Sequence, residues 1–344
     1  MGVGYEVQVD GTVRSWGRND SGQLGAGSMP WRNLPGPVPG LSGVKSVAGG
    51  YQTAYAIKSD GTVWAWGDNS TNQLGDGTTD SRSAPARIQG LSDVIDVAAT
   101  YYGAIALKKD GSVWAWGLYT MGADAMHAEV RPVPQQLSGL SSIKAIAAGS
   151  SSNYALKSDG TVWAWGDNGS GQLGDGTTTE RLSPVKVSNL ASVKAISAGN
   201  GTAYALQTDG TARAWGSNSW GQLGDGTTTW RSLPVTIAGL SGVAALEGGD
   251  GNGYALMKDG TVRGWGYNTL GAVGSGDTAE RHLPTPVIGV TGAVAVSSGS
   301  ACAYVVLANG DALAWGWNEF GQLGDGTYEN RARPVAFGVQ GSPL

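Results

Sequence analysis

The 344-residue chain has few charged residues, few histidines and one cysteine, and each shortage excludes a class of function. Charged side chains make up 14% of the sequence, against about 25% in an average soluble domain. Cys302 stands alone, which excludes an internal disulfide bond and a cysteine-based zinc site. His127 and His282 leave little material for a catalytic triad or an imidazole metal site. We therefore expect no catalytic residue, no metal and no cofactor.

Long apolar runs and excess positive charge are also missing. No stretch approaches the roughly 18 apolar residues that cross a bilayer, so we expect no membrane insertion. The formal net charge of −5 argues against a nucleic-acid partner, because phosphate binding needs clustered lysine and arginine. No signal peptide is visible at the N-terminus, so we expect any targeting segment to be absent or removed.

Glycine and tryptophan, in contrast, are in excess, with 58 and 14 residues. The 13 prolines and the absence of a Gly-X-Y period exclude collagen. A hydrophobic content of 40% argues against disorder. The excess therefore needs a repeated structural cause.

Seven copies of one unit, spaced 49 or 50 residues apart, supply that cause. Each copy has a short hairpin dipeptide, then a Trp-Gly pair, then an arginine. The hairpin turns are expected at residues 10–11, 60–61, 110–111, 159–160, 209–210, 259–260 and 309–310. The repeated tryptophans are Trp16, Trp66, Trp116, Trp165, Trp215, Trp265 and Trp315. The recurrent arginines are Arg32, Arg82, Arg131, Arg181, Arg231, Arg281 and Arg331.

Each unit predicts four short strands. In the fifth unit, residues 193–198 and 204–208 alternate with period two, 211–215 follow the hairpin, and the fourth strand begins at Pro234. The Asp209-Gly210 pair predicts a two-residue type I′ turn. Four strands in a unit of about 50 residues predict an all-β, seven-bladed β-propeller, a single domain over residues 1–344. The repeated tryptophans are expected to be core between neighbouring sheets.

One first strand is missing from the pattern. First strands begin near residues 44, 94, 143, 193, 243 and 294, so only six are found for seven units. We therefore predict that one blade has three strands, or that its fourth strand lies outside these residues. An unpaired strand edge would also favour association.

The repeated residues carry a resemblance to a known family. The string Asp-Gly-Thr-Val-Trp-Ala-Trp-Gly at 60–67, with Asn69, the Gln-Leu-Gly-Asp-Gly string at 73–77, Arg82 and Pro85, resembles the regulator of chromosome condensation repeat, of the bacterial type. The resemblance implies a seven-bladed propeller. No unit keeps the histidine that usually follows the first strand in eukaryotic repeats. No long insertion matches the family's exchange factor for a small GTPase, and no pentads match its plant photoreceptor, so neither function is expected.

One end of the propeller is expected to carry the function. The loops between first and second strands emerge at the same end as those between third and fourth strands, and both sets vary among units. Diversified loops on a rigid scaffold usually bind, and Tyr and Trp dominate interface hot spots. Solvent-facing drift is the alternative explanation of this variation. The candidate partner-binding residues are Tyr51, Gln52, Tyr101, Tyr102, Leu118, Tyr119, Trp220, Asp250, Tyr267, Trp317 and Phe320.

The third unit departs from the others between residues 118 and 127, where another sequence replaces the Gly-Gln-Leu-Gly-Asp-Gly string. This segment is interpreted either as a decayed repeat or as a specialised contact loop.

Other patterns that suggest chemistry are interpreted as framework. One Gly-Asp-Gly-Thr carboxylate per blade cannot supply the 6–8 oxygens of a calcium site, so these aspartates are expected to stabilise turns. The recurrent arginines are expected to bond carboxylates or backbone rather than an anion. Cys302 is expected to be buried or inert.

The predicted function is therefore a non-enzymatic module that binds a protein through its variable loops. Inhibition of an extracellular enzyme such as a β-lactamase is one variant, implied by a distant bacterial member of the family. A carbohydrate-binding or cell-surface domain, with Trp and Tyr as stacking plates, is the alternative. We favour a secreted or cell-surface location over the cytoplasm.

Overall fold

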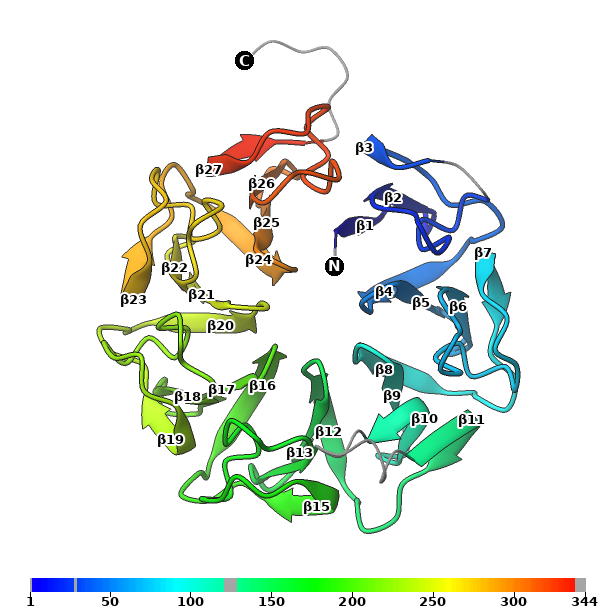
Figure 1. The fold of residues 1–344 in the computed structure, drawn as a ribbon, viewed down its shortest axis with the longest axis horizontal. Helices are drawn as coiled ribbons and strands as arrows, with labels where there is room; N and C mark the ends of the chain where they lie inside the picture. The colour runs from blue at the N-terminus through cyan, green and yellow to red at the C-terminus, as the bar shows by residue number, and fades with distance from the viewer. Residues whose placement is uncertain (1, 28–29, 121–128, 338–344) are drawn as a thin grey trace.

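The chain forms a ring of seven antiparallel sheets around a central axis (Figure 1). This computed structural model describes residues 2–27, 30–120 and 129–337. The described residues contain strands and no helix, and hence no helix able to cross a membrane. The strands are β1 (Val3–Val7), β2 (Val13–Gly17) and β3 (Arg32–Pro37) in blade 1; β4 (Val44–Gly49), β5 (Thr53–Lys58), β6 (Val63–Gly67) and β7 (Arg82–Arg87) in blade 2; β8 (Val94–Ala99), β9 (Gly103–Lys108), β10 (Val113–Thr120) and β11 (Glu129–Gln136) in blade 3; β12 (Ile143–Ala148), β13 (Ser152–Lys157), β14 (Val162–Gly166) and β15 (Arg181–Lys186) in blade 4; β16 (Val193–Gly199), β17 (Thr202–Gln207), β18 (Ala212–Gly216) and β19 (Arg231–Thr236) in blade 5; β20 (Val243–Gly248), β21 (Asn252–Met257), β22 (Val262–Gly266) and β23 (Arg281–Pro286) in blade 6; and β24 (Ala293–Ser298), β25 (Cys302–Leu307), β26 (Ala312–Gly316) and β27 (Arg331–Ala336) in blade 7.

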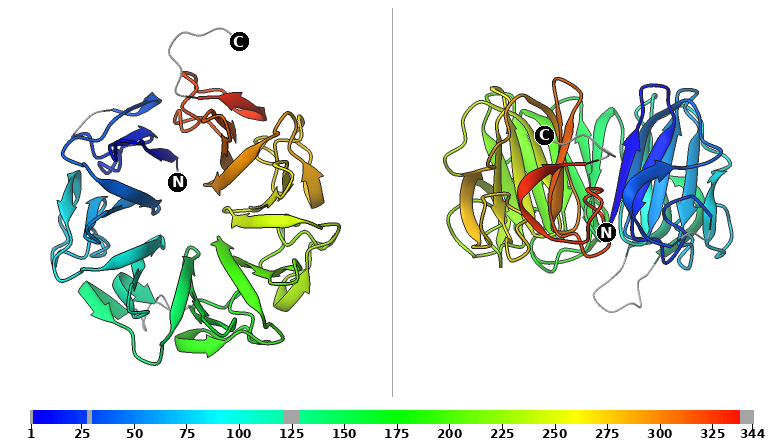
Figure 2. Two further views of the ribbon diagram at one scale, coloured as in Figure 1. Left: turned by 180° about the vertical axis from the view of Figure 1, so that it is seen from behind. Right: turned by 90° about the horizontal axis from the view of Figure 1, so that it is seen from above.

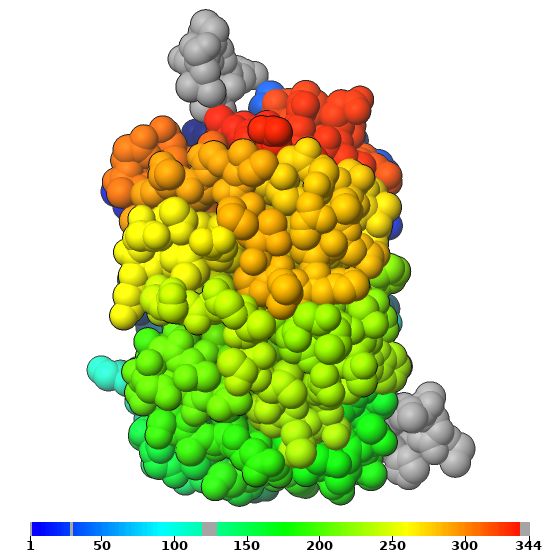
Figure 3. All heavy atoms as spheres, turned by 90° about the vertical axis from the view of Figure 1, so that its left-hand side faces the viewer, coloured from blue at the N-terminus to red at the C-terminus, as the bar shows by residue number. Residues whose placement is uncertain are grey.

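Six blades have four strands and blade 1 has three, which confirms the predicted propeller and its incomplete blade. The first strand of each four-stranded blade lies nearest the axis and the fourth lies on the outside (Figure 1). The strands run from one face of the ring to the other (Figure 2). Seen from the side, the wall of blades 5 to 7 is a continuous surface (Figure 3).

The hairpin turns differ from the predicted type. A type I′ turn needs positive φ at both central residues, but at the hairpin of the second unit Gly61 has positive φ, at 76°, and Asp60 does not. The Lys58 N–H donates to the Thr62 carbonyl, and the Gly61 N–H donates to the Lys58 carbonyl. These bonds define a three-residue loop that ends in a left-handed glycine. The Asp60 carboxylate stabilises it by accepting from the Thr62 N–H at 3.0 Å.

The fourth strands also begin earlier than predicted. β19 starts at Arg231, so Pro234 lies inside the strand rather than at its start. The outer strand pairs on one side only, and its register against β18 shifts between Ala214 and Gly216. A proline is tolerated there because an edge strand with a bulge needs no N–H at every position.

The repeated tryptophans form the core between blades, as predicted, and each is at most 1% exposed. The Trp215 indole N–H of blade 5 donates to the Gln172 carbonyl of blade 4 at 2.9 Å. The same carbonyl accepts from the Tyr154 hydroxyl of its own blade at 2.7 Å. The equivalent bond from Trp16 to the Gln322 carbonyl closes the ring between blades 1 and 7. At six junctions, all except that of Trp165, aromatic burial is therefore combined with a satisfied indole N–H.

The aspartates and arginines of the repeat form a second part of the framework. Asp225 accepts from the Thr227 N–H at 2.9 Å and pairs with Arg231 at 2.9 Å. The buried Asn218 accepts from the Leu223 N–H at 2.9 Å. The same ion pair joins Arg82 to Asp76, Arg181 to Asp175 and Arg331 to Asp325. In these blades both residues hold a loop, in agreement with the structural roles predicted for them.

Candidate protein-binding face

The two sets of variable loops meet at one end of the ring. In blade 2, the N–H of Asp68, which follows the Trp-Gly pair, donates to the Gln52 carbonyl in the loop between β4 and β5. The same bond joins Ser217 to Gly201 and Trp317 to Ala301. We call this end the loop face. The opposite end, which carries the hairpin turns, is the turn face.

Three tyrosines gather on one sector of the loop face. Tyr51 and Tyr101, from neighbouring blades, have ring centroids 4.8 Å apart, and Tyr101 and Tyr102 are 6.2 Å apart. Tyr51 and Tyr102 are exposed, whereas Tyr101 is half-buried. We call these three residues the tyrosine cluster. The structure thus brings together residues that were predicted only as separate loop positions.

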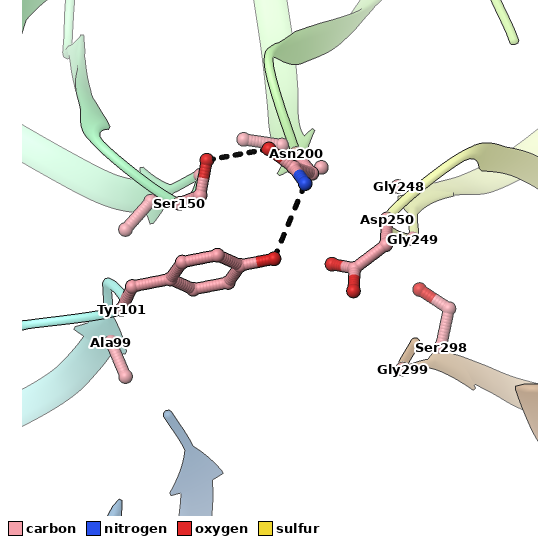
Figure 4. Close-up of a pocket in the computed structure, with 13 residues that line it drawn as sticks. Ala99, Tyr101, Ser150, Asn200, Gly248, Gly249, Asp250, Ser298 and Gly299 are labelled. Carbon is pink, nitrogen blue, oxygen red and sulfur yellow. Dashed lines mark hydrogen bonds between the residues drawn. The ribbon is translucent and has the colours of Figure 1, made fainter. Parts of the chain in front are cut away.

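Tyr101 of the tyrosine cluster borders the mouth of the central channel, where side chains from different blades converge (Figure 4). The Asn200 side-chain N–H donates to the Tyr101 hydroxyl at 3.2 Å, and the Ser150 hydroxyl donates to the Asn200 carbonyl oxygen at 2.7 Å. The Asp250 carboxylate accepts from the Ser300 hydroxyl. A cavity of about 50 Å³ is lined by Tyr101, Ser150, Asn200 and Asp250, and it is too small for more than a water or the tip of a side chain.

The protonation state of Tyr101 follows from its position. Burial raises the pKa of the Tyr101 hydroxyl above its ordinary value, and the negative charge of Asp250 raises it further. The hydroxyl therefore stays neutral near neutral pH. The mouth offers hydroxyl, amide and carboxylate groups, which recognise hydrogen-bond donors and positive charge.

Two further aromatic groups lie on the loop face. Trp220 packs edge-on against Tyr267 with ring centroids 5.1 Å apart, and 44% of Trp220 is exposed. Phe320 lies between Trp317, at 5.1 Å, and Trp31, at 4.6 Å. The Arg18 guanidinium lies 5.0 Å from the Phe320 ring centroid. We call the first group the Trp220 pair and the second the Phe320 cluster.

Trp31 and Arg18 were not among the predicted site residues. Trp31 precedes the recurrent Arg32, and Trp230 holds the same place before Arg231. The indole N–H of Trp31 donates to Asp20 at 2.5 Å, and that of Trp230 donates to Ser219 at 2.9 Å. Both indoles thus lie against the loops that follow Trp-Gly. In the sequence, Trp31 and Trp230 could have been recognised as candidate surface residues because they lie outside the seven repeated Trp-Gly pairs.

The candidate residues of the third unit are only partly described. The Leu118 N–H donates to the Tyr102 carbonyl at 2.8 Å, and Leu118 is half-buried. Tyr119 lies near the end of β10. Residues 121–128, which hold most of the altered segment, lie outside the described residues.

The junction between blades 3 and 4 differs from the others in its described residues. Ile105 stands where the other six blades have the hydroxyl-bearing tyrosine of the second strand. The Trp165 indole N–H is buried and has no partner among the described residues. Among the described residues, the junction between blades 3 and 4 therefore lacks both the tyrosine hydroxyl and the indole hydrogen bond of the other junctions.

Other chemistry has little support in the described part of the chain. No group of three His, Cys, Asp or Glu residues there could hold a metal ion. Cys302 is buried at the start of β25, and burial raises its pKa to about 11. Its sulfur lies 3.7 Å from the Tyr304 hydroxyl. The thiol is therefore protonated and shielded.

Comparison with protein families identifies the repeat. A model described as the regulator of chromosome condensation (RCC1) repeat matches residues 10–57, 60–107, 159–206, 209–256, 259–306 and 309–340. A second model of the repeat matches residues 44–73, 94–122, 143–172 and 193–222. The first model leaves out residues 108–158, which contain the altered segment. No curated protein matches the sequence.

Solved structures share the fold. Prp20p from Saccharomyces cerevisiae, described with its binding to Gsp1p and histones, superposes with a TM-score of 0.86 and 24% identity, over 97% of this chain and 87% of that one. Yeast RCC1 (Prp20) bound to Kap60 gives a TM-score of 0.85 and 24% identity, over 94% and 82%. Human WBSCR16 gives 0.84 and 22% identity, over 97% and 95%. At this identity the likeness shows the shared fold.

Proposed function

The chain belongs to the regulator of chromosome condensation (RCC1) repeat family, and we propose that it is a non-enzymatic module whose protein partner contacts the loop face. The observation that carries the proposal is the gathering of aromatic side chains in the tyrosine cluster, the Trp220 pair and the Phe320 cluster. The repeat itself assigns these side chains no role in the core.

The chemistry of these side chains fits protein recognition. Tyrosine and tryptophan supply large contact areas at a low cost in conformational entropy, and both have a polar tip. The rings already pack against one another, so less side-chain freedom is lost when a partner binds. The aromatic groups would form apolar anchors around the polar channel mouth.

The polar groups of the channel mouth indicate which kind of partner side chain would lie at the axis. The Asp250 carboxylate and the Asn200 amide lie at its centre, beside the hydroxyl of Tyr101. A lysine or arginine side chain of the partner would find a carboxylate and neutral acceptors there. We therefore propose that the partner presents a basic residue to the axis and apolar side chains to the surrounding clusters.

Solved structures of the same fold give general support. Yeast RCC1 is described in complex with Kap60, and Prp20p with its binding to Gsp1p and histones. Those partners belong to the yeast proteins. They support the proposal only to the extent that this type of propeller carries protein-binding surfaces.

The experiment compares two variants in capture assays with the surface fraction of the source organism. The loop-face variant carries four aromatic-to-alanine changes, at Tyr101, Tyr102, Trp220 and Trp317. The control variant carries four changes to alanine at exposed apolar residues away from the loop face, Val9, Ile95, Ile288 and Val294. We expect the first variant to lose the captured protein and the second to keep it, with circular dichroism showing that both are folded. Capture that survives the loop-face changes would move the site elsewhere.

Parallel assays test two other functions, inhibition of an extracellular enzyme and carbohydrate binding. Inhibition of an extracellular enzyme is a special case of protein binding, and inhibition of a purified β-lactamase tests its most concrete form. Carbohydrate binding would instead appear as signals on a glycan array that disappear when Trp220 is changed to alanine. A glycan signal without any captured protein would contradict the proposal.

A further inference from the structure

Blade 1 leaves one edge of its sheet unpaired at the central channel. β1 pairs with β2 on one side, and no described strand pairs with its other side. In blade 2 the equivalent edge, on β5, is covered by β4 from Val44 to Gly49. β1 lies between β24 and β4 beside the channel, in Figure 1 and in the reverse view of Figure 2. We call the uncovered side of β1 the open edge.

A cavity occupies the place of the missing strand. Its volume is about 380 Å³, and its walls include β1, β24 and the second strand of blade 7. Val306 of that strand is 43% exposed, whereas its counterparts Ile57 and Leu206 are 3% and 0% exposed. The exposure has a clear cause, because in complete blades these residues pack against the first strand of the next blade.

The six complete blades show what the open edge accommodates. In each, the first and fourth residues of the first strand are apolar, and in blade 3 these residues, Val94 and Val97, pack against Tyr55 and Ile57 of blade 2. The fourth residue lies directly opposite a residue of the second strand. These opposed pairs are Val47 and Ala56, Val97 and Ala106, Ile146 and Ala155, Ile196 and Ala205, Leu246 and Ala255, and Val296 and Val305.

Blade 1 differs at this opposed position, where it has Glu6. Glu6 lines the cavity, whereas the five alanines at equivalent positions are fully buried. A strand added to the open edge would place its fourth residue against this carboxylate. An aliphatic side chain there would bury the carboxylate and leave it only Arg14, which lies opposite Glu6 on β2, whereas lysine or arginine would pair with it on the open side.

We propose that the open edge binds an extended peptide segment by β-strand addition. Backbone hydrogen bonds to β1 supply the general affinity, and the cavity selects the side chains. The segment carries an aliphatic residue at its first position, lysine or arginine at its fourth and small residues after it. This site is separate from the loop face, so either proposal can fail without the other.

The test uses two capped seven-residue peptides and the full chain. The isoleucine peptide, Ile-Lys-Ala-Ile-Ala-Ala-Gly, copies residues 143–149. The lysine peptide, Ile-Lys-Ala-Lys-Ala-Ala-Gly, has lysine at the fourth position. Titration calorimetry measures both against the wild type, Glu6→Gln and Glu6→Ala. The alanine variant restores the residue found in most complete blades, and circular dichroism checks its folding.

We expect the wild type to bind the lysine peptide at least about tenfold more tightly than the isoleucine peptide. Glu6→Gln should lose this preference, and Glu6→Ala should reverse it. Hydrogen exchange of the β1 amides that point away from β2 should be fast in the free protein and slow with the lysine peptide. The proposal is overturned by equal binding of both peptides, by a lysine preference that survives both variants, or by no binding. Slow exchange of these outward-pointing amides in the free protein would also overturn it, because the chain's own residues would then cover the edge.

Discussion

The inter-blade hydrogen bond of the repeated tryptophans can be measured by comparing Trp215→Phe with Trp165→Phe. Both indoles are fully buried at equivalent junctions, so phenylalanine removes the same volume from each. Trp215 donates to the Gln172 carbonyl at 2.9 Å, whereas the Trp165 N–H has no partner among the described residues. The two variants therefore differ mainly in what happens to one N–H group.

The size of the difference follows from these contacts. Trp215→Phe loses one buried hydrogen bond, at a cost of about 1 kcal/mol. The Gln172 carbonyl stays satisfied because the Tyr154 hydroxyl still donates to it. Trp165→Phe loses no bond to a described residue and removes a buried donor whose desolvation costs about 1–3 kcal/mol. We expect Trp215→Phe to destabilise the protein by about 2–4 kcal/mol more than Trp165→Phe.

Urea unfolding followed by far-UV circular dichroism gives both free energies of unfolding, and equal slopes would show that the variants unfold in the same way. Trp66→Phe serves as a replicate, because its indole also donates to a glutamine carbonyl, at 2.8 Å. Equal destabilisation at all three junctions would refute the reasoning and show that burial alone determines the contribution of these tryptophans.

Three further predictions concern the framework. Burial raises the pKa of Asp225, but the hydrogen bonds from Thr227 and Arg231 outweigh it and lower the pKa below its ordinary value. The charged carboxylate therefore stabilises the protein at neutral pH, and this stabilisation is lost as the pH falls through the folded-state pKa. Asp225→Asn should weaken the acid dependence of the urea midpoint. Gly216→Ala should lower the free energy of unfolding by about 3 kcal/mol or more, because φ is +102° and the added Cβ would clash with the Gly201 carbonyl oxygen. Gly239→Ala is the control: with φ of +68° and open space around it, it should lower the free energy of unfolding by about 1 kcal/mol in the same urea assay. Cys302, buried and with its pKa raised to about 11, should react with a thiol reagent only at the rate of unfolding, and fast labelling of the folded protein would contradict its burial.

The fold could be predicted from the sequence because the repeat consists of residues that each suit one structural position. Trp215 recurs at a fixed interval since each blade must fill the same junction, and Gly216 recurs because its φ of +102° excludes side chains. The missing first strand was equally visible, because a strand pattern expected seven times was found six times.

The details that escaped prediction depend on backbone geometry that several sequences share. An Asp-Gly pair suits both a two-residue turn and the three-residue loop, and only the φ of Asp60 separates them. Pro234 marked a strand boundary in the sequence, but an outer strand with a bulge accepts it internally.

The candidate site was predictable as a set of positions and not as an arrangement. Connectivity alone placed Tyr101 and Asp250 at one end of the ring. That Asn200 bonds to Tyr101 across the channel mouth depends on the closure of the ring. The Phe320 cluster was found only in part, because Trp31 lies next to a recurrent arginine and resembles the framework in sequence.

Site-specific photo-crosslinking tests the central claim, that the loop face binds a protein. A photoreactive phenylalanine analogue replaces Tyr102 on the loop face in one protein and Val9 on the turn face in the other, both exposed. After irradiation with the surface fraction of the source organism, the account predicts a discrete protein adduct at position 102 and none at position 9. An adduct at position 9, or none at either position, would contradict it.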